Sequence, residues 1–381
     1  MVERPVRVLH LISSLDVGGA EHSLFRLVTS MNRDLFANEV VCMKDQGPMG
    51  RRLEEAGIPV HSLKMKKGTP EFSAIFRLRF LRNLFQPDII QCWMYHANLM
   101  GLTLFQASRT LWNIRCSDMD LTIYGAVYRF SVLAGARLSR FPRAVVVNSQ
   151  EGRSIHEKLG YHPREWIVIP NGINTDIFRP DLAARVLTRK SLDIPEDALV
   201  IGLVCRFDPM KDHATFFQAA GKFLKVYPDA RFVLAGRGVE RTNQDMKRLV
   251  PGGDVADRMY FLGERQDIEK IYPLFDIMTS SSAWGEGFPN VIAEAMACGI
   301  PCAATDVGDT GLLIGDTGIL VRRRSPGCLC SAWDTIARMD LAGRKAMGIK
   351  ARERIRLHYS QERTTGTYEQ CYRGIAAMHP K

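Results

Sequence analysis

Short apolar runs alternate with longer amphipathic segments along the first half of the chain. The apolar runs are rich in β-branched residues and predict strands at Val6–Ile12, Glu39–Met43, Asp88–Cys92, Leu111–Ile114 and Ala144–Val147. The segments between them predict helices near Gly19–Met31, Phe72–Phe85, Ala126–Leu138 and Gln150–Leu159. Near-continuous apolar strands that are separated by helices are typical of a parallel sheet with helices on both faces.

The same alternation resumes after a stretch that is rich in turn-forming residues. Further strands are predicted at Leu199–Cys205, Ala230–Leu234, Met259–Phe261, Asp276–Thr279 and Cys302–Ala304. Because proline-containing turns cluster between them, we place the domain change within Pro170–Pro195. The last segments, Ala342–Tyr359 and Glu362–Met378, predict helices.

This pattern predicts an α/β protein with two Rossmann-like, doubly wound parallel-sheet domains. The domains are expected at residues 1–176 and 177–360, followed by a C-terminal helix at 361–381. A length of 381 residues is enough for two domains that each bury a core.

Composition and cysteine spacing indicate the class of protein and its expected compartment. Hydrophobic residues make up 46% of the chain and charged residues 24%, as in ordinary globular proteins. The nine cysteines form no CxxC pair, so neither a zinc site nor a disulfide framework is indicated, and a reducing cytoplasm is expected. The N-terminus does not have the pattern of a secretory signal, and no run of about 18 apolar residues predicts a membrane span.

Positive charge is concentrated in the first half of the chain. Residues 1–180 hold 23 Lys and Arg against 16 Asp and Glu, a net charge of +7, whereas residues 181–381 hold 28 against 25, a net charge of +3. A basic half favours an acidic partner, such as an anionic bilayer, a lipid diphosphate or nucleic acid. Because the sequence contains none of the usual nucleic-acid-binding modules, nucleic acid is not expected as a partner.

The segment from Ser280 to Gly299 holds the most informative pattern. An apolar strand leads into hydroxyl residues, then into Glu286 between two glycines, and then into a helix that Pro289 and Gly299 delimit. Free backbone N–H groups at such a helix start favour an anion such as a diphosphate. Because a carboxylate beside a phosphate is unfavourable, Glu286 and Glu294 are better suited to the hydroxyls of a sugar or a ribose. The alternative is a solvated loop glutamate and an ordinary helix glutamate.

This segment resembles the Glu-x7-Glu signature of the retaining nucleotide-sugar glycosyltransferases of GT-B fold, the family 4 or group 1 type of bacterial polysaccharide and lipopolysaccharide transferases. Other stretches fit the same group in the expected order, and they are Val17–Glu21, Ile169–Asn174, Cys205–His213, Phe232–Gly238 and Phe261–Arg265. The resemblance covers nearly the whole chain. It implies two domains that face each other across a cleft, with the last helix crossing back onto the first domain.

The resemblance also implies an activity. The chain is expected to move a hexose-type sugar, with retention, from a UDP- or GDP-linked donor to a glycan or to a polyprenyl- or lipid-linked acceptor. Such an enzyme would work in cell-surface polysaccharide synthesis, in the cytoplasm or peripherally on the inner face of the cytoplasmic membrane.

Roles for single residues follow from the same resemblance. Arg206 and Lys211 are expected to bind the donor diphosphate, Glu286 the hydroxyls of the hexose and Glu294 those of the ribose. Cations aimed at the leaving diphosphate stabilise the charge that grows as the glycosidic bond breaks. A pair of surface cations is the alternative for Arg206 and Lys211. The other expected donor contacts are Gly287, Phe288, Pro289, Asn290 and Val291.

Four further residues complete the expected site. Gly18 and Gly19 open the first helix and would offer amides to the phosphate, with tight strand-to-helix packing as the alternative. His96, at a predicted strand end, matches the family's histidine beside the donor sugar, and joins Arg206, Lys211 and Glu286 in the expected catalytic set. Arg265 lies where the family holds the nucleotide base.

A metal is not expected. Asp118-Met119-Asp120 formally matches a DxD pattern, which binds a divalent metal in glycosyltransferases of another fold. It falls in the first domain, however, away from the expected diphosphate cations, so we expect no metal and no cofactor besides the donor substrate. Arg115 and Asp118 are candidate acceptor-side residues.

A basic stretch in the first domain has two interpretations. Arg77, Arg79 and Arg82 interleave with the apolar residues of Phe72–Phe85. Such a segment can lie on an anionic membrane surface. A helix that packs on the sheet and carries a basic outer face explains the pattern equally well.

Two other functions use the same fold. A nucleotide-sugar epimerase would share the diphosphate site without an acceptor groove, and product analysis without acceptor separates it from a transferase. A non-catalytic glycan-binding protein could lose Glu286, Arg206 or Lys211, and all three are present. A dehydrogenase is disfavoured because Gly236-Arg237-Gly238 is only half of a GxGxxG motif.

Overall fold

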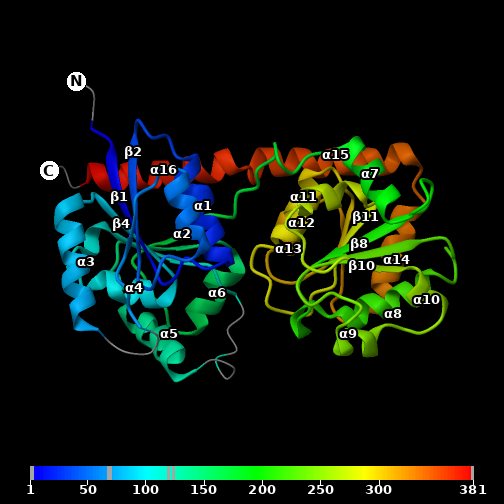
Figure 1. Cartoon of the computed structure of the whole chain (residues 1–381), viewed down its shortest axis with the longest axis horizontal. Helices are drawn as coiled ribbons and strands as arrows, with labels where there is room; N and C mark the ends of the chain where they lie inside the picture. The colour runs from blue at the N-terminus through cyan, green and yellow to red at the C-terminus, as the bar shows by residue number, and fades with distance from the viewer. Residues whose placement is uncertain (1–3, 67–70, 118–120, 122–124, 379–381) are drawn as a thin grey trace. The chain divides into compact units, whose positions relative to one another are not determined.

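The computed structural model describes residues 4–66, 71–117, 121 and 125–378. The chain divides into two compact units (Figure 1). Unit 1 comprises Met1–Gly172 together with Gln361–Lys381, and unit 2 comprises Ile173–Ser360. The division after Gly172 lies slightly before the boundary at residue 176 that the sequence predicts.

Unit 1 is built on one parallel sheet. Its strands are β1 (Val6–Ile12), β2 (Phe36–Cys42), β3 (Val60–Ser62), β4 (Ile89–Trp93), β5 (Thr110–Ile114), β6 (Ala144–Val147) and β7 (Trp166–Val168). They lie in the order β3-β2-β1-β4-β5-β6-β7, and each neighbouring pair is parallel. The chain therefore winds outward in both directions from β1 and β4, as in a doubly wound sheet.

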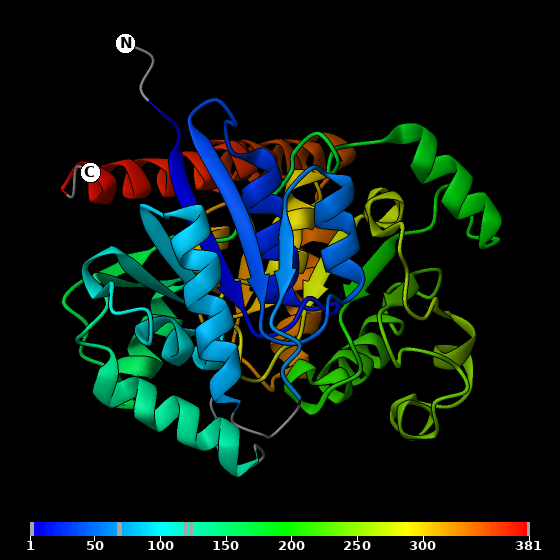
Figure 2. The same ribbon diagram turned by 60° about the vertical axis from the view of Figure 1, so that its left-hand side comes forward.

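Helices cover both faces of this sheet. They are α1 (Gly19–Ser30), α2 (Pro48–Glu55), α3 (Phe72–Phe85), α4 (Met94–Leu102), α5 (Ala126–Leu138), α6 (Gln150–Lys158) and α16 (Gln361–Ala377). Successive β1 side chains enter opposite cores: Val8 packs with α1 and α16, whereas Leu9 packs with α3 and α5. Figure 2 shows α3 lying along the sheet.

The C-terminal helix α16 belongs to unit 1, where it packs on α1, β1 and β4. Tyr368 and Tyr372 are buried on its inner side. Their hydroxyls pair with sheet residues, since Asn113 Nδ2 lies 2.8 Å from Tyr368 and the Tyr372 hydroxyl donates to Gln91 Oε1 at 3.0 Å. Buried polar groups of the strands are thereby satisfied by the end of the chain.

Unit 2 repeats the architecture. Its strands are β8 (Val200–Val204), β9 (Arg231–Ala235), β10 (Met259–Phe261), β11 (Ile277–Ser280), β12 (Cys302–Thr305) and β13 (Ile319–Val321). They lie in the order β10-β9-β8-β11-β12-β13 and are parallel throughout. The predicted fold class, two doubly wound α/β domains, is confirmed.

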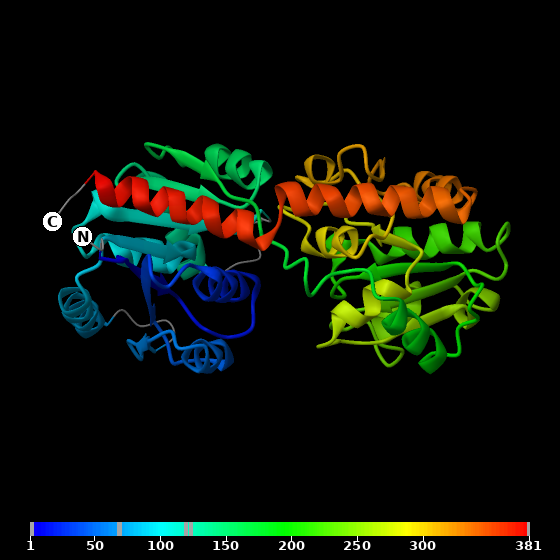
Figure 3. The same ribbon diagram turned by 90° about the horizontal axis from the view of Figure 1, so that it is seen from above.

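The helices of unit 2 also lie on both faces of its sheet (Figure 3). They are α7 (Leu182–Ser191), α8 (His213–Phe223), α9 (Gln244–Leu249), α10 (Asp254–Asp257), α11 (Ile268–Ile271), α12 (Asn290–Ala297), α13 (Thr310–Ile314), α14 (Pro326–Ala337) and α15 (Leu341–His358). Val200 of β8 packs toward α12 and α15, and its neighbour Ile201 packs toward α8 and α14. Within the described part of the chain, no helix combines the length and apolarity that crossing a membrane requires.

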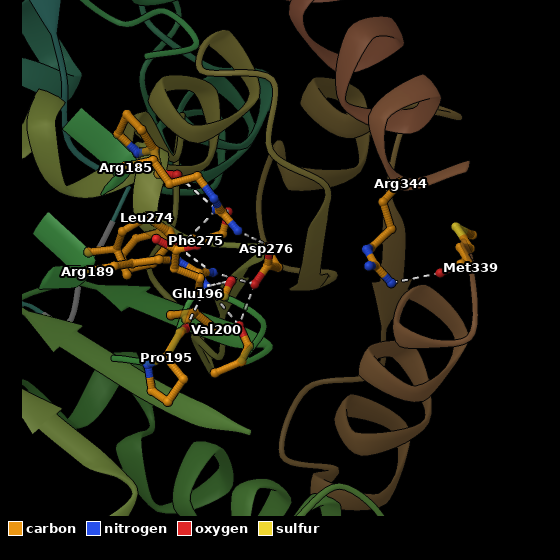
Figure 4. Close-up of polar contacts among 12 residues, drawn as sticks. Arg185, Arg189, Pro195, Glu196, Val200, Leu274, Phe275, Asp276, Met339 and Arg344 are labelled. Carbon is orange, nitrogen blue, oxygen red and sulfur yellow. Dashed lines mark hydrogen bonds and ion pairs between the residues drawn. The ribbon is translucent and has the colours of Figure 1, made fainter. Parts of the chain in front are cut away.

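An ionic cluster fastens α7 to the amino-terminal edge of this sheet (Figure 4). Arg185 and Arg189 both point toward Asp276, at 2.7 and 2.8 Å from its two carboxylate oxygens. The same carboxylate accepts the backbone N–H of Val200 at 2.8 Å. Because Arg189 also donates to backbone carbonyls, its buried charge is fully paired, and the cluster is explained by structure alone.

Candidate active site

The predicted donor residues gather at one edge of the unit 2 sheet. β8 and β11 are neighbours although β9 and β10 lie between them in sequence, so the chain changes winding direction there. A crevice at the carboxyl ends of such strands is where doubly wound folds bind ligands. Arg206 and Lys211 follow β8, and the loop that holds Glu286 follows β11 and leads into α12.

Lys211 and Glu286 form the centre of this site. Lys211 Nζ lies 2.5 Å from Glu286 Oε1, and the two side chains are 14% and 9% exposed. The same carboxylate oxygen accepts the Ser282 hydroxyl at 2.5 Å. Lys211 ends a short 3-10 turn, Pro209–Lys211, which Asp208 caps by accepting the N–H of Met210 at 3.0 Å. A short turn thus fixes the cation against the carboxylate.

Residues that the sequence analysis did not assign hold the two loops together. Ser281 Oγ donates to the Lys211 carbonyl at 2.7 Å, and Thr305 Oγ1 donates to the Ser282 carbonyl at 2.7 Å. Gly308 has φ +59°, and a Cβ there would lie 1.8 Å from the Glu286 carbonyl oxygen. The close approach of these backbones therefore requires glycine. The run of hydroxyl residues at Ser280–Ser282 is the sequence feature from which these supporting contacts could have been predicted.

Glu294 is anchored on α12. It is 8% exposed, and the buried Tyr272 hydroxyl donates to its Oε2 at 2.8 Å. Burial and the adjacent carboxylate raise the pKa of Tyr272 well above its ordinary value, so the phenol stays a hydrogen-bond donor. One carboxylate oxygen of Glu294 is thereby fixed by the protein interior.

The start of α12 matches the pattern that the sequence predicted, with one difference. Pro289 is the N-cap of α12 rather than its first helical residue, and Gly299 lies just past the end with φ +74°. The predicted contacts Gly287, Phe288, Asn290 and Val291 lie in the loop and first turn. Val291 and Lys211 line one small hollow with Ser280–Ser282, so these elements meet below the strand ends.

The two predicted arginines of unit 2 are held by acidic neighbours. Arg206 Nε lies 2.9 Å from Asp208 Oδ2, and its side chain is 48% exposed. Arg265 makes two contacts of 2.8 Å with Asp267, at the end of the edge strand β10. Arg206 lies in the loop between β8 and the 3-10 turn that ends at Lys211. Contacts of either arginine with a nucleotide stay predictions.

In unit 1 the predicted residues lie at the carboxyl ends of β1 and β4, again at the change of winding direction. Gly18 caps α1 and Gly19 begins it. His96 lies in the first turn of α4, with its ring 6.1 Å from that of Tyr128. Burial, and then the positive charge of Lys44, lower the pKa of His96 below its ordinary value, so it is neutral at pH 7.

The acceptor-side candidates have different outcomes. Arg115 donates to Asn171 and lies 3.3 Å from the Tyr368 hydroxyl, so it ties β5 to the Asn171 turn and to α16. Its role toward an acceptor stays a prediction. Asp118-Met119-Asp120 lies outside the described residues. Within the described residues, no group of three or more His, Cys, Asp and Glu side chains is arranged to hold a metal ion.

Family models place both units in one group of enzymes. Residues 198–338 match the model for glycosyl transferases group 1, and residues 17–177 match that for glycosyltransferase family 4. The chain belongs to the family 4, group 1 glycosyltransferases. The expected family is thereby confirmed.

Curated relatives agree with this family, and a solved structure agrees with the fold. The chain is 25% identical to the putative glycosyltransferase EpsF of Bacillus subtilis over 96% of both proteins. It is 27% identical to the UDP-Gal:α-D-GlcNAc-diphosphoundecaprenol α-1,3-galactosyltransferase of Escherichia coli, over 49% of this chain and 48% of that enzyme. The match thus spans about half the length of that relative. The structure of Anabaena HepE in complex with UDP aligns with a TM-score of 0.82 at 21% identity, over 97% of this chain and all of that one, which confirms the GT-B fold.

Proposed function

We propose that this family 4 glycosyltransferase transfers a hexose-type sugar from a nucleotide diphosphate donor to a glycan or lipid-linked acceptor, with retention. The pairing of Lys211 with Glu286 at the carboxyl ends of β8 and β11 is the observation that carries the proposal. It places a cation and a carboxylate side by side. A diphosphate needs the first, and sugar hydroxyls donate hydrogen bonds to the second.

In the proposed reaction, the bond between the sugar's anomeric carbon and the diphosphate oxygen breaks. Lys211 and Arg206 stabilise the negative charge that grows on the departing phosphate. The acceptor hydroxyl attacks from the same face, and its proton passes to the leaving phosphate. This route needs no protein nucleophile, and retention follows from the side of attack.

The remaining donor contacts follow from the same site. Glu286 holds hydroxyls of the hexose and Glu294 those of the ribose, with the backbone N–H groups of Gly287, Phe288, Asn290 and Val291 beside the sugar and phosphate. Uridine diphosphate is our preferred carrier because structures of the similarly folded HepE contain UDP and UDP-glucose. Because side chains supply the positive charge, we propose that no divalent cation is required.

The acceptor is proposed to be part of cell-surface polysaccharide synthesis. The galactosyltransferase relative is named for a sugar acceptor that is linked to diphosphoundecaprenol. An enzyme with such an acceptor would work at a membrane surface, and the surface of unit 1 suits that location.

The surface in question is on α3. Its inner side buries Ala74 and Leu78, whereas its outer side carries an exposed apolar stripe of Phe72, Phe76, Phe80 and Leu84, each 67–76% exposed. The outer face is therefore aromatic rather than purely basic, with the positive charge of Arg77 beside it. We propose that this stripe contacts an anionic bilayer, to which the net positive charge of residues 1–180 is complementary.

Nucleotide release with a panel of donors tests the function. The protein is incubated with UDP-glucose, UDP-galactose, UDP-N-acetylglucosamine and GDP-mannose, with and without a bacterial lipid extract, and free UDP or GDP is measured. We expect release with one donor that increases when acceptor is present. Conversion of the donor to an epimer without acceptor, or no binding of any donor, would contradict the proposal.

A further inference from the structure

A large cavity opens at the carboxyl edge of the unit 1 sheet, outside the donor site of unit 2. Its volume is about 910 Å³, within the range of about 300–1,000 Å³ that is typical of ligand pockets. Segments that follow β1, β2, β3 and β4 supply one part of its wall, and α5 supplies the other. Its position at the change of winding direction is where a doubly wound domain binds its ligand.

Most of the wall of this cavity is apolar. Met43 and Met65 line it from the loops after β2 and β3, Leu99 from α4, and Val127 and Phe130 from α5. Methionine side chains adapt their shape to apolar ligands. A free glycan is a poor occupant, because its hydroxyls would lose their hydrogen bonds with water and find few partners on these walls.

The charged residues of the wall are two lysines. Lys44 and Lys66 line the cavity after β2 and β3, which are paired as far as Cys42 and Ser62. Both lysines therefore leave the sheet at the same edge. His96, in the first turn of α4, lines the same cavity. Two cations beside an apolar chamber fit an anionic head group joined to an apolar chain.

We propose that this cavity binds the apolar chain and phosphate of a lipid phosphate or diphosphate, with Lys44 and Lys66 at the phosphate. This inference rests on the proposed function and names its acceptor as a lipid-linked one. On the rim, Val127 and Phe130 are 58% and 69% exposed, so the chain can continue from the cavity over α5 into a bilayer. His96 would lie close to the head group, where the acceptor's sugar begins.

Two amphiphiles of equal chain length test the inference. Decyl phosphate and decyltrimethylammonium, both below their critical micelle concentrations, are titrated into the full chain by isothermal calorimetry without nucleotide. We expect decyl phosphate to bind at least about tenfold more tightly. Lys44→Gln with Lys66→Gln should remove that preference. Equal binding of the two amphiphiles to the parent protein would overturn the assignment of a phosphate site.

A matched pair of variants on α5 tests the chamber itself. Phe130 and Leu133 are both exposed on this helix, at 69% and 50%, but only Phe130 is among the residues that line the cavity. Phe130→Asp should weaken decyl phosphate binding about tenfold or more, and Leu133→Asp should leave it unchanged. Equal effects of the two variants would show that the chain does not enter this cavity.

Binding of UDP to the same protein separates this inference from the proposed function. A chain that binds UDP but not decyl phosphate would overturn the cavity assignment alone. A chain that binds decyl phosphate but no nucleotide would instead contradict the proposed donor site and leave the lipid site standing.

Discussion

Lys211 Nζ lies 2.5 Å from Glu286 Oε1, although the two residues are 75 positions apart and follow different strands. Both side chains are largely buried, so the interaction between them is strong. A bound donor would have to fit around it, with its phosphate at Lys211 and its sugar at Glu286. The cation is already held in place by the protein, as the proposed electrostatic role of Lys211 requires.

Removal of the cation should lower the rate of transfer. We expect Lys211→Ala to lower kcat about 100-fold or more, because the positive group that we propose stabilises the leaving phosphate is lost. Steady-state kinetics of UDP release measures this change. Lys222→Ala, at an exposed position of α8, is the control and should keep the parent rate.

The same pair makes a prediction about stability. Lys211→Ala leaves the Glu286 carboxylate buried without its cation and should cost about 3 kcal/mol of unfolding free energy. Adding Glu286→Gln removes the unpaired charge, so the double variant should regain most of that stability while staying inactive. Urea unfolding followed by circular dichroism reports the difference. If the loss of stability in the double variant equals the sum of the losses in Lys211→Ala and Glu286→Gln alone, the two residues do not interact.

Tyr272 should act on nucleotide affinity through Glu294. Tyr272→Phe removes the hydroxyl that donates to Glu294 Oε2, so the carboxylate loses its fixed orientation. We expect the Kd for UDP to rise about fivefold to tenfold with little change in kcat. Tyr227→Phe is a matched control because the Tyr227 hydroxyl donates to another carboxylate, Asp334 Oδ1, at the same distance of 2.8 Å. An equal change in both variants would argue against a positioning role.

Two buried histidines predict how stability depends on pH. Burial lowers the pKa of His10 and of His213 from 6.5 to about 4. In the unfolded chain they bind protons below about pH 6.5, and in the folded chain only below about pH 4. Stability is therefore fully present above the unfolded pKa and falls as the pH drops from 6.5 toward 4, by about 2 kcal/mol per histidine at pH 5.

Urea unfolding of the parent and of His213→Phe at pH 7.5 and pH 5 checks this dependence. The variant should lose less stability between the two pH values, because one titrating group is gone. The same loss in both proteins would show that protonation of His213 does not couple to unfolding.

The α3 stripe predicts membrane binding. Phe76→Asp combined with Phe80→Asp should lower partitioning onto phosphatidylglycerol vesicles about tenfold or more, because two apolar side chains no longer enter the interface. Cosedimentation measures the bound fraction. Leu341→Asp, at a position of unit 2 that is 61% exposed, should bind vesicles like the parent. Partitioning that is unchanged in the double variant would exclude the stripe as the contact.

The sequence predicted the fold wherever periodicity was strong. β1, β6, β10, α3 and α5 have the bounds that the apolar pattern indicated. The three-residue edge strands β3, β7 and β13 were not predicted, although β10 has the same length and was, because strands this short carry little periodicity. The outer face of α3 was not predictable either, since apolar residues occur on both of its sides.

The site was predictable only in part, for a related physical reason. Lys211, Glu286 and Glu294 lie within sequence motifs, and the family resemblance implies a donor-binding role for each of them. Tyr272 carries no such pattern, and the hydroxyl run that contains Ser282 does not say which group each hydroxyl contacts. Both partners are set by how the folded loops and helices pack. Which hydroxyl donates to which carboxylate can be determined only from the folded positions of the loops.

Binding of UDP to the parent protein and to Glu294→Ala is the most direct test of the central claim that unit 2 holds a nucleotide diphosphate. At about 100 times its Kd, UDP should stabilise the parent by about 2.7 kcal/mol in a thermal unfolding experiment. Glu294→Ala, once circular dichroism shows it folded, should gain almost none of this stabilisation. Equal stabilisation of the parent and the variant by UDP, or none of the parent by any nucleotide, would contradict the account.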